Sequence, residues 1–188
     1  MTMTADQPAA SGNRRMLVIL AVGGAVAVAL GVYGNVHDPS GRSLVTLFFS
    51  AGINLKVWLA SVAVVFAVAQ VVLALRMYGK LGSKPAAEWL GSAHRISGTL
   101  AFLFTLPVSY HCLWALGFHA DSGARVLIHS IAGCFFYGAF AAKVLSVRSR
   151  KLPDWSLPVV GGAVFTGLAL AWFTSSYWFF TNVDFPGF

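Results

Sequence analysis

The sequence predicts an all-α, polytopic membrane protein built from five transmembrane helices. Of its 188 residues, 57% are hydrophobic and only 10% are charged, and its mean hydropathy is +0.74. An ordinary soluble domain carries about 25% charged residues. Because a helix needs about 20 apolar residues to cross a bilayer, a chain of this length has room for the spans and their loops but not for a separate soluble catalytic domain. The protein must therefore act in or at the membrane.

Five apolar stretches are long enough to span the hydrocarbon core. They cover residues 16–33, 57–75, 90–118, 126–147 and 157–180. Together they form one transmembrane domain, 16–180, between a polar tail, 1–15, and a second tail, 181–188. The linkers 79–88, 120–125 and 148–154 are short and carry charged residues or prolines, which predicts loops.

The first span resembles the core of a signal peptide, because Arg14 and Arg15 precede it and residues 25–27 imitate a cleavage site. At about 18 unbroken apolar residues it is long enough to remain as an anchor, and we expect it to be retained. The connection that follows, 35–54, contains an apolar run, 44–49, that is too short to cross. We expect this segment to lie at the membrane interface.

The distribution of lysine and arginine predicts a cytoplasmic N-terminus, since cytoplasmic loops keep an excess of basic residues. With that orientation ten of the 13 basic residues lie inside, and only Arg42, Lys56 and Arg125 lie outside. The ten are Arg14, Arg15, Arg76, Lys80, Lys84, Arg95, Lys143, Arg148, Arg150 and Lys151. The formal charge of +7 therefore reflects membrane topology rather than nucleic-acid binding, and the C-terminal tail is predicted to lie outside.

Chemically distinctive residues are few. The chain has no P-loop, dinucleotide fingerprint, Cys-x-x-Cys motif or paired catalytic carboxylates. Cys112 and Cys134 both lie inside spans and are expected to be small buried side chains rather than part of a disulfide framework. The histidines remain as the candidates for chemistry.

His111 and His129 form the most informative pair. The turn between the third and fourth spans is centred near residue 120, nine residues from each histidine. Antiparallel neighbouring helices would therefore place both imidazoles at the same depth, roughly 10 Å below the outer helix ends at about 1.5 Å per residue. Ionisable side chains in spans usually belong to a site, and two imidazoles at one level can supply both axial ligands of a b-type haem. A hydrogen-bonded structural pair and another metal or proton site are the alternatives.

Residues around this pair fit the haem hypothesis. Arg125, one turn above His129, would provide a cation for propionates that point outward. Gly133, one turn below His129, would let a flat macrocycle approach the backbone, and Pro107 predicts a bend before His111. A second haem would require ligands about 14 residues further along each helix, where the chain has Ser97 and Lys143. We therefore expect one haem.

The other histidines are weaker candidates. His94, next to Arg95, is off the face of His111 and is interpreted as a polar residue at the inner headgroup level. His37 lies in a turn-rich outer segment, where it and His119, together with Arg42 and Lys56, are candidates for docking a redox partner.

Two resemblances to known families add to this interpretation. The run 93–98, the segment Ser109-Tyr110-His111 and the helix bearing His129 resemble the haem-binding helix pairs of the cytochrome b and ferric-reductase-like membrane families, which implies a haem-binding bundle. Those families generally carry four haem-ligating histidines, whereas this chain has one matched pair. Residues 55–60, 94–100, 106–112 and 133–140 are similar to an uncharacterised family of five-helix bacterial membrane proteins, which implies a fold and a place in the bacterial cytoplasmic membrane but no activity.

Two functions therefore compete. In the first, one haem b near the outer leaflet relays electrons between quinol in the membrane and an extracytoplasmic iron–sulfur or cytochrome c type protein, which would make the chain a subunit of a membrane oxidoreductase with a possible quinone site. In the second, the chain is a cofactor-free accessory or assembly subunit of a larger membrane complex. An optical spectrum of the purified protein separates these expectations.

Overall fold

The computed structural model describes residues 7–43, 45–82, 85–119 and 121–183, and every regular element among them is a helix. Within these described ranges five helices are long and apolar enough to cross a membrane, which confirms the predicted fold class of a multi-pass, all-α membrane protein. The elements are α1 (Gln7–Val36), α2 (Gly52–Met77), α3 (Trp89–Tyr110), η1 (His111–Leu116), α4 (Ala124–Arg148), α5 (Ser156–Trp172), η2 (Phe173–Tyr177) and α6 (Trp178–Asn182).

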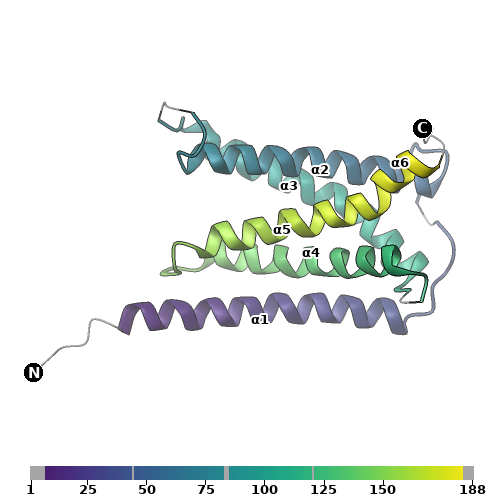
Figure 1. Ribbon diagram of the computed structural model, residues 1–188, viewed down its shortest axis with the longest axis horizontal. Helices are drawn as coiled ribbons and strands as arrows, with labels where there is room; N and C mark the ends of the chain where they lie inside the picture. The colour runs from purple at the N-terminus through teal and green to yellow at the C-terminus, as the bar shows by residue number, and fades with distance from the viewer. Residues whose placement is uncertain (1–6, 44, 83–84, 120, 184–188) are drawn as a thin grey trace, which may run out of the picture.

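Two of the spans contain a π-helical segment near one end, which the sequence does not predict. The third span continues from α3 into η1 and the fifth from α5 into η2, and both π-helical segments lie at the same end of the bundle (Figure 1). Gly117 ends η1 with φ +74°, a conformation that glycine adopts readily. A Cβ there would lie 3.0 Å from the Gly34 carbonyl oxygen, so the close approach of α1 also requires a glycine.

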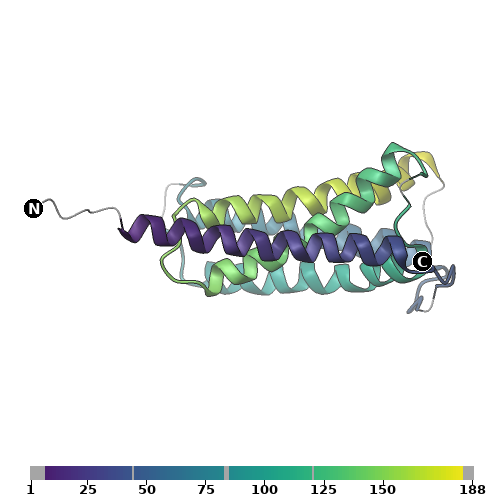
Figure 2. The same ribbon diagram turned by 90° about the horizontal axis from the view of Figure 1, so that it is seen from below.

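The helices pack as two groups. Helix α2 packs along α3, while α4 packs along both α1 and α5 (Figures 1 and 2). Helices α3 and α4 are joined by a short loop, but neither is the other's main packing partner. The expectation that consecutive helices 3 and 4 pack face to face is therefore not met, and this arrangement leaves space between them.

Small residues allow α1 and α4 to approach closely. A Cβ on Gly23 would lie 2.7 Å from the Gly138 carbonyl oxygen, and a Cβ on Gly138 would lie 2.4 Å from the Gly23 carbonyl oxygen. Ala27 and Ala142 follow these glycines by one turn, which gives each helix a small-xxx-small pattern of the kind that lets membrane helices pack backbone to backbone.

Polar side chains connect the two groups of helices at three levels. Lys143 Nζ donates to Gln70 Oε1 at 3.5 Å, Tyr137 Oη donates to Thr105 Oγ1 at 2.9 Å, and Trp172 Nε1 donates to Ser61 Oγ at 2.9 Å. In an apolar solvent these bonds specify which helix faces meet. Between the polar levels the core is apolar, with Ala63, Phe136 and Leu168 at its centre.

The segment after α1 closes over η1. Its backbone amides at Ser40 and Gly41 donate to the carbonyl oxygens of Trp114 and Ala115, at 3.3 and 3.0 Å. These bonds satisfy carbonyl groups that the end of a helix otherwise leaves without partners. Within the predicted interfacial segment the described residues between His37 and Ala51 are non-helical, and Phe49 is buried against Leu55.

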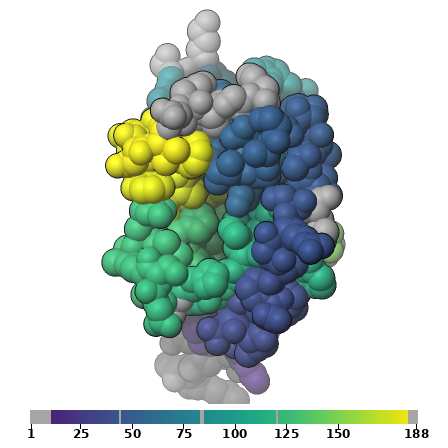
Figure 3. All heavy atoms as spheres, turned by 90° about the vertical axis from the view of Figure 1, so that its right-hand side faces the viewer, coloured from purple at the N-terminus to yellow at the C-terminus, as the bar shows by residue number. Residues whose placement is uncertain are grey.

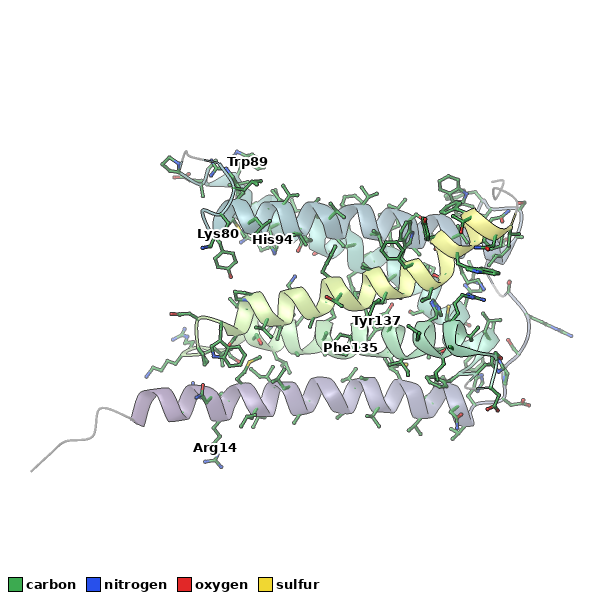
Figure 4. All side chains as sticks on the ribbon, in the orientation of Figure 1. Arg14, Lys80, Trp89, His94, Phe135 and Tyr137 are labelled. Carbon is green, nitrogen blue, oxygen red and sulfur yellow. The ribbon has the colours of Figure 1, made fainter. Side chains whose placement is uncertain are left out.

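We call the end at which α1 begins the inner end and the opposite end the outer end. Arg14, Lys80 and His94 lie toward the inner end (Figure 4), as the charge distribution predicts, whereas Lys84 lies outside the described residues.

We expect reporter fusions after Lys80 and after Lys151 to be cytoplasmic, and fusions near Asp121 or at Phe188 to be extracytoplasmic, because basic loops stay inside. Alkaline phosphatase and green fluorescent protein fusions measure this, and the reverse pattern would place His129 in the inner leaflet.

Candidate functional site

An apolar cavity of about 180 Å³ lies in the outer half of the bundle. Helices α3 and α4 and segment η1 supply most of its lining, with Thr105 and Tyr137 at its deeper end and His119 near its outer end. Figure 3 views the outer end, where α6, the α1–α2 connection and the start of α4 surround recessed atoms. The space that separates α3 from α4 is thus a cavity at the level where the sequence predicts a site.

His129 lines this cavity. Its Nδ1 lies 3.0 Å from the Ala171 carbonyl oxygen and 3.3 Å from Thr174 Oγ1. The Thr174 hydroxyl donates to the Leu170 carbonyl at 2.7 Å, so it accepts from the ring. A carbonyl oxygen only accepts, and Nδ1 of the neutral ring therefore carries the proton while Nε2 keeps its lone pair.

In His111, as in His129, Nδ1 carries the proton and donates to a backbone carbonyl, but the ring lies outside the cavity. Its side chain is 2% exposed, and its Nδ1 donates to the Pro107 carbonyl oxygen at 2.8 Å. Its Nε2 is buried without a hydrogen-bond partner. This atom lies 4.0 Å from the position that a Cβ on Gly52 would occupy, so the ring faces the start of α2.

The two histidines match in depth but do not share the cavity. His111 lies five residues before the end of the third span at Leu116, and His129 lies five residues after the start of the fourth at Ala124. His129 is among the residues that line the cavity and His111 is not. The depth expected from counting residues along the chain is therefore present, whereas the structure does not bring the two imidazoles together across one space.

The two π-helical segments flank the cavity. Leu113 and Leu116 of η1 and Ser175 of η2 contribute to its wall. Short π-helical turns within α-helices occur frequently at functional sites, because the extra residue per turn widens the helix and costs hydrogen-bond quality. Their position on both sides of one cavity marks it as the leading candidate site of this protein.

Arg125 and Gly133 differ in how they relate to the cavity. The Arg125 guanidinium donates to the Thr174 carbonyl at 2.6 Å and lies 3.9 Å above the centre of the Trp178 ring. It therefore attaches α4 to the end of the fifth span instead of lining the cavity. Gly133 does line the cavity, and a Cβ there would meet no atom within 4 Å, so the backbone is open to a ligand at that point.

His37 and His94, the weaker candidates from the sequence, lie away from the cavity. The His37 ring stacks on Tyr33 with a centroid distance of 5.1 Å, and its Nε2 lies 3.2 Å from the Trp114 carbonyl oxygen, so it attaches the end of α1 to η1. His94 lies in the inner half of α3, and its Nδ1 is buried without a hydrogen-bond partner. Neither residue lines the cavity.

Gln70, which no sequence pattern singled out, organises a polar cluster in the inner half of the bundle. Its Nε2 donates to the His94 carbonyl and, at 2.7 Å, to Ser97 Oγ, while its Oε1 accepts from Lys143. Gly98 provides the space, because a Cβ there would lie 2.8 Å from Gln70 Oε1. Ser97 and Lys143, the positions of a second haem level, are thus bridged by an amide. A single glutamine within an apolar span was the available signal.

This cluster gives a prediction about stability. The spans contain no Asp or Glu, so Lys143 is a cation held in the bundle without a carboxylate in any span. We expect Lys143→Met to leave the stability unchanged or to raise it, because it removes a desolvated charge. Gln70→Leu leaves that charge without its acceptor and should lower the stability by about 1–2 kcal/mol.

Thermal unfolding of both variants in the same detergent measures the difference. An equal loss of stability in the two single variants would show that the Lys143–Gln70 bond itself stabilises the bundle. The double variant provides the control, since Lys143→Met should restore the part of the stability that Gln70→Leu loses through the charge without an acceptor, but not the part lost with the Nε2 bonds to His94 and Ser97.

Cys112 and Cys134 are both free thiols, as expected for residues inside spans. Among the described residues no group of three or more His, Cys, Asp or Glu side chains is arranged to hold a metal ion.

The fold and the cavity define a five-helix integral membrane protein with a candidate site in the outer half of its bundle. Within that class, the chain belongs to a family of unknown function, DUF6529, whose model matches residues 16–187. This agrees with the predicted likeness to an uncharacterised family. No curated protein and no solved structure matches the chain, so the likeness to cytochrome b and ferric-reductase-like proteins stays a prediction.

Proposed function

We propose that this protein is a membrane-embedded electron-transfer protein of the b-type cytochrome kind, with His111 and His129 as the axial ligands of one haem. The observation that carries the proposal is the common hydrogen bonding of the two rings. In each ring Nδ1 donates to a backbone carbonyl, at 2.8 Å in His111 and 3.0 Å in His129. Metal-ligating histidines almost always make such a bond, which fixes the tautomer and leaves Nε2 to bind the metal.

The donor chemistry fits a haem, while the available space fits only part of one. A cavity of about 180 Å³ is close in size to the roughly 150 Å³ that accommodates a benzene molecule. Haem binding therefore requires η1 and α4 to move apart until the cavity reaches Nε2 of His111, whose Nδ1 keeps its bond to the Pro107 carbonyl. A bound haem would supply one-electron transfer, and Gly133 would let it lie close to the α4 backbone.

The proposed partners follow from the position of the cavity in the outer half of the bundle. Quinol in the bilayer is the proposed electron source, and an extracytoplasmic iron–sulfur or cytochrome c type protein is the proposed acceptor. His119 lines the outer part of the cavity and is exposed, so it lies where such a partner would approach. The bacterial cytoplasmic membrane is the proposed location, since the charge distribution along the chain has the pattern of a cytoplasmic-membrane protein.

The experiment is an optical spectrum of the protein purified from haem-replete cells, recorded oxidised and reduced. We expect Soret and α bands of a low-spin b haem and a haem-to-protein ratio near one. A protein that is colourless when purified from such cells contradicts the proposal.

The second candidate is a cofactor-free accessory subunit of a larger membrane complex. It is favoured by the direction of His111, whose ring faces Gly52 and does not line the cavity with His129. A colourless protein that co-purifies stoichiometrically with other membrane subunits would support this function.

A further inference from the structure

A second pocket, of about 450 Å³, lies at the inner end of the bundle. Its walls come from Tyr78 at the end of α2, from the last turn of α4 and the loop 149–155, and from the start of α5. This pocket is remote from the outer cavity and from His111 and His129. Because α4 ends at Arg148 and α5 begins at Ser156, the pocket lies at the level where lipid headgroups meet the protein.

The pocket contains a hydroxyl group without a partner. Ser146 lines it, is 2% exposed, and has no hydrogen-bond partner for its Oγ. A buried polar atom without a partner costs free energy, and such atoms are uncommon in native structures unless a ligand, an ion or water satisfies them. Ser146 is therefore a hydrogen-bond donor available to a ligand in this pocket.

The loop that carries the pocket's cation is held in a strained conformation. Lys151 has φ +60°, which is unusual for a residue with a side chain and is found preferentially at functional sites. Helix α1 maintains this conformation, because Arg15 Nη1 donates to the Arg150 carbonyl at 3.0 Å and only a glycine at position 12 fits against the Lys151 carbonyl. The start of α1 thus fixes the position of Lys151 in the wall of the pocket.

The pocket is lined by one basic and one acidic side chain and by apolar side chains. Lys151 and Asp154 both line it and both are exposed. Val147 and Leu157, which also line it, are 65% and 42% exposed and lie on the spans beside the loop. The complementary ligand has a negative group, a positive group a few atoms away and apolar chains, which is the chemistry of a zwitterionic phospholipid.

We propose that this pocket binds the headgroup of a phosphatidylethanolamine-type lipid. Lys151 and the Ser146 hydroxyl donate to the phosphate, Asp154 accepts from the primary ammonium, and the acyl chains lie along Val147 and Leu157. A choline headgroup has no N–H to donate to a carboxylate, and a glycerol headgroup has no positive charge. The pocket therefore discriminates among lipids that have identical chains.

The test is lipid binding to the full-length, delipidated protein in detergent, measured by native mass spectrometry with the ethanolamine, choline and glycerol lipids of one chain composition. We expect the ethanolamine lipid to bind about tenfold more tightly than the choline lipid, the size of one charge-assisted hydrogen bond. Asp154→Asn should abolish that preference. Lys151→Gln should weaken the binding of the ethanolamine lipid and of the choline lipid to the same extent. Arg150 is a neighbouring basic residue that does not line the pocket, so Arg150→Gln should leave the affinity for both lipids unchanged.

Equal binding of the three lipids to the unaltered protein, or an ethanolamine preference that survives Asp154→Asn, overturns the proposal. Tightest binding of the glycerol lipid also overturns it, because attraction to the basic inner end would then explain the affinity. Asp154 is exposed, so its substitution is not expected to impair folding. The assay requires no haem, and its result is independent of the proposed redox function.

Discussion

Replacing either His129 or His111 by alanine is expected to reduce the bound haem at least about tenfold and to abolish the low-spin spectrum, because each change leaves the iron with one strong axial ligand. His129 lines the outer cavity, so its loss removes the ligand that already faces the space. His111 has a buried Nε2 without a hydrogen-bond partner, so its loss removes the only other imidazole at that depth among the described residues. The haem-to-protein ratio and the reduced α band measure both effects.

Three further histidine variants provide matched controls. His37→Ala, His94→Ala and His119→Ala should all retain the spectrum. His119 is the most stringent of them, because it lines the same cavity as His129 yet lies outside the helices. If His94→Ala abolished the spectrum while His129→Ala preserved it, the axial ligand would have to come from the inner half of α3, and the pairing of residues 111 and 129 would be wrong.

The number and approximate positions of the helices follow from the length of the apolar stretches, but the helix pairing does not. In a membrane, apolar side chains cover both the lipid-facing and the protein-facing sides of a helix, so hydrophobic periodicity does not identify the packed face. The face is instead marked by small and polar residues, which here are Gly23, Gly138 and Gln70. Helix α2 begins at Gly52, five residues before the predicted start at 57, because polar and charged residues such as Lys56 are accommodated in its first turns.

The sequence predicts how far along their helices His111 and His129 lie, but it does not predict the side toward which each ring points. Counting residues from the turn gives the level of His111 and His129, because the rise per residue is nearly constant. The side of the helix on which a residue lies depends on its phase, and the π-helical turn of η1 changes that phase relative to an α-helix. The sequence carries no clear signal for η1 beyond Pro107, so the orientation of His111 toward Gly52 could not be predicted.

The closest approach of α1 to α4 should make Gly23 one of the most sensitive positions in the chain. A valine at this position would place its Cβ 2.7 Å from the Gly138 carbonyl oxygen and 3.0 Å from Ala142 Cβ. A backbone oxygen cannot move away without its helix, so Gly23→Val must separate α1 from α4 along their contact. We expect a loss of about 3 kcal/mol, the upper end of the range for overpacking, and hence a fall of roughly 10 °C in the melting temperature.

Gly24→Val is the matched control, since Gly24 is the next residue of the same helix and a Cβ there would meet no atom within 4 Å. Both variants introduce the same β-branched residue into α1, so any difference in helix propensity between them is small, and the difference in melting temperature reports the α1–α4 contact alone. Gly138→Ala should behave like Gly23→Val, because its Cβ would lie 2.4 Å from the Gly23 carbonyl oxygen. Equal melting temperatures for Gly23→Val and Gly24→Val would mean that α1 does not pack on α4 through this face.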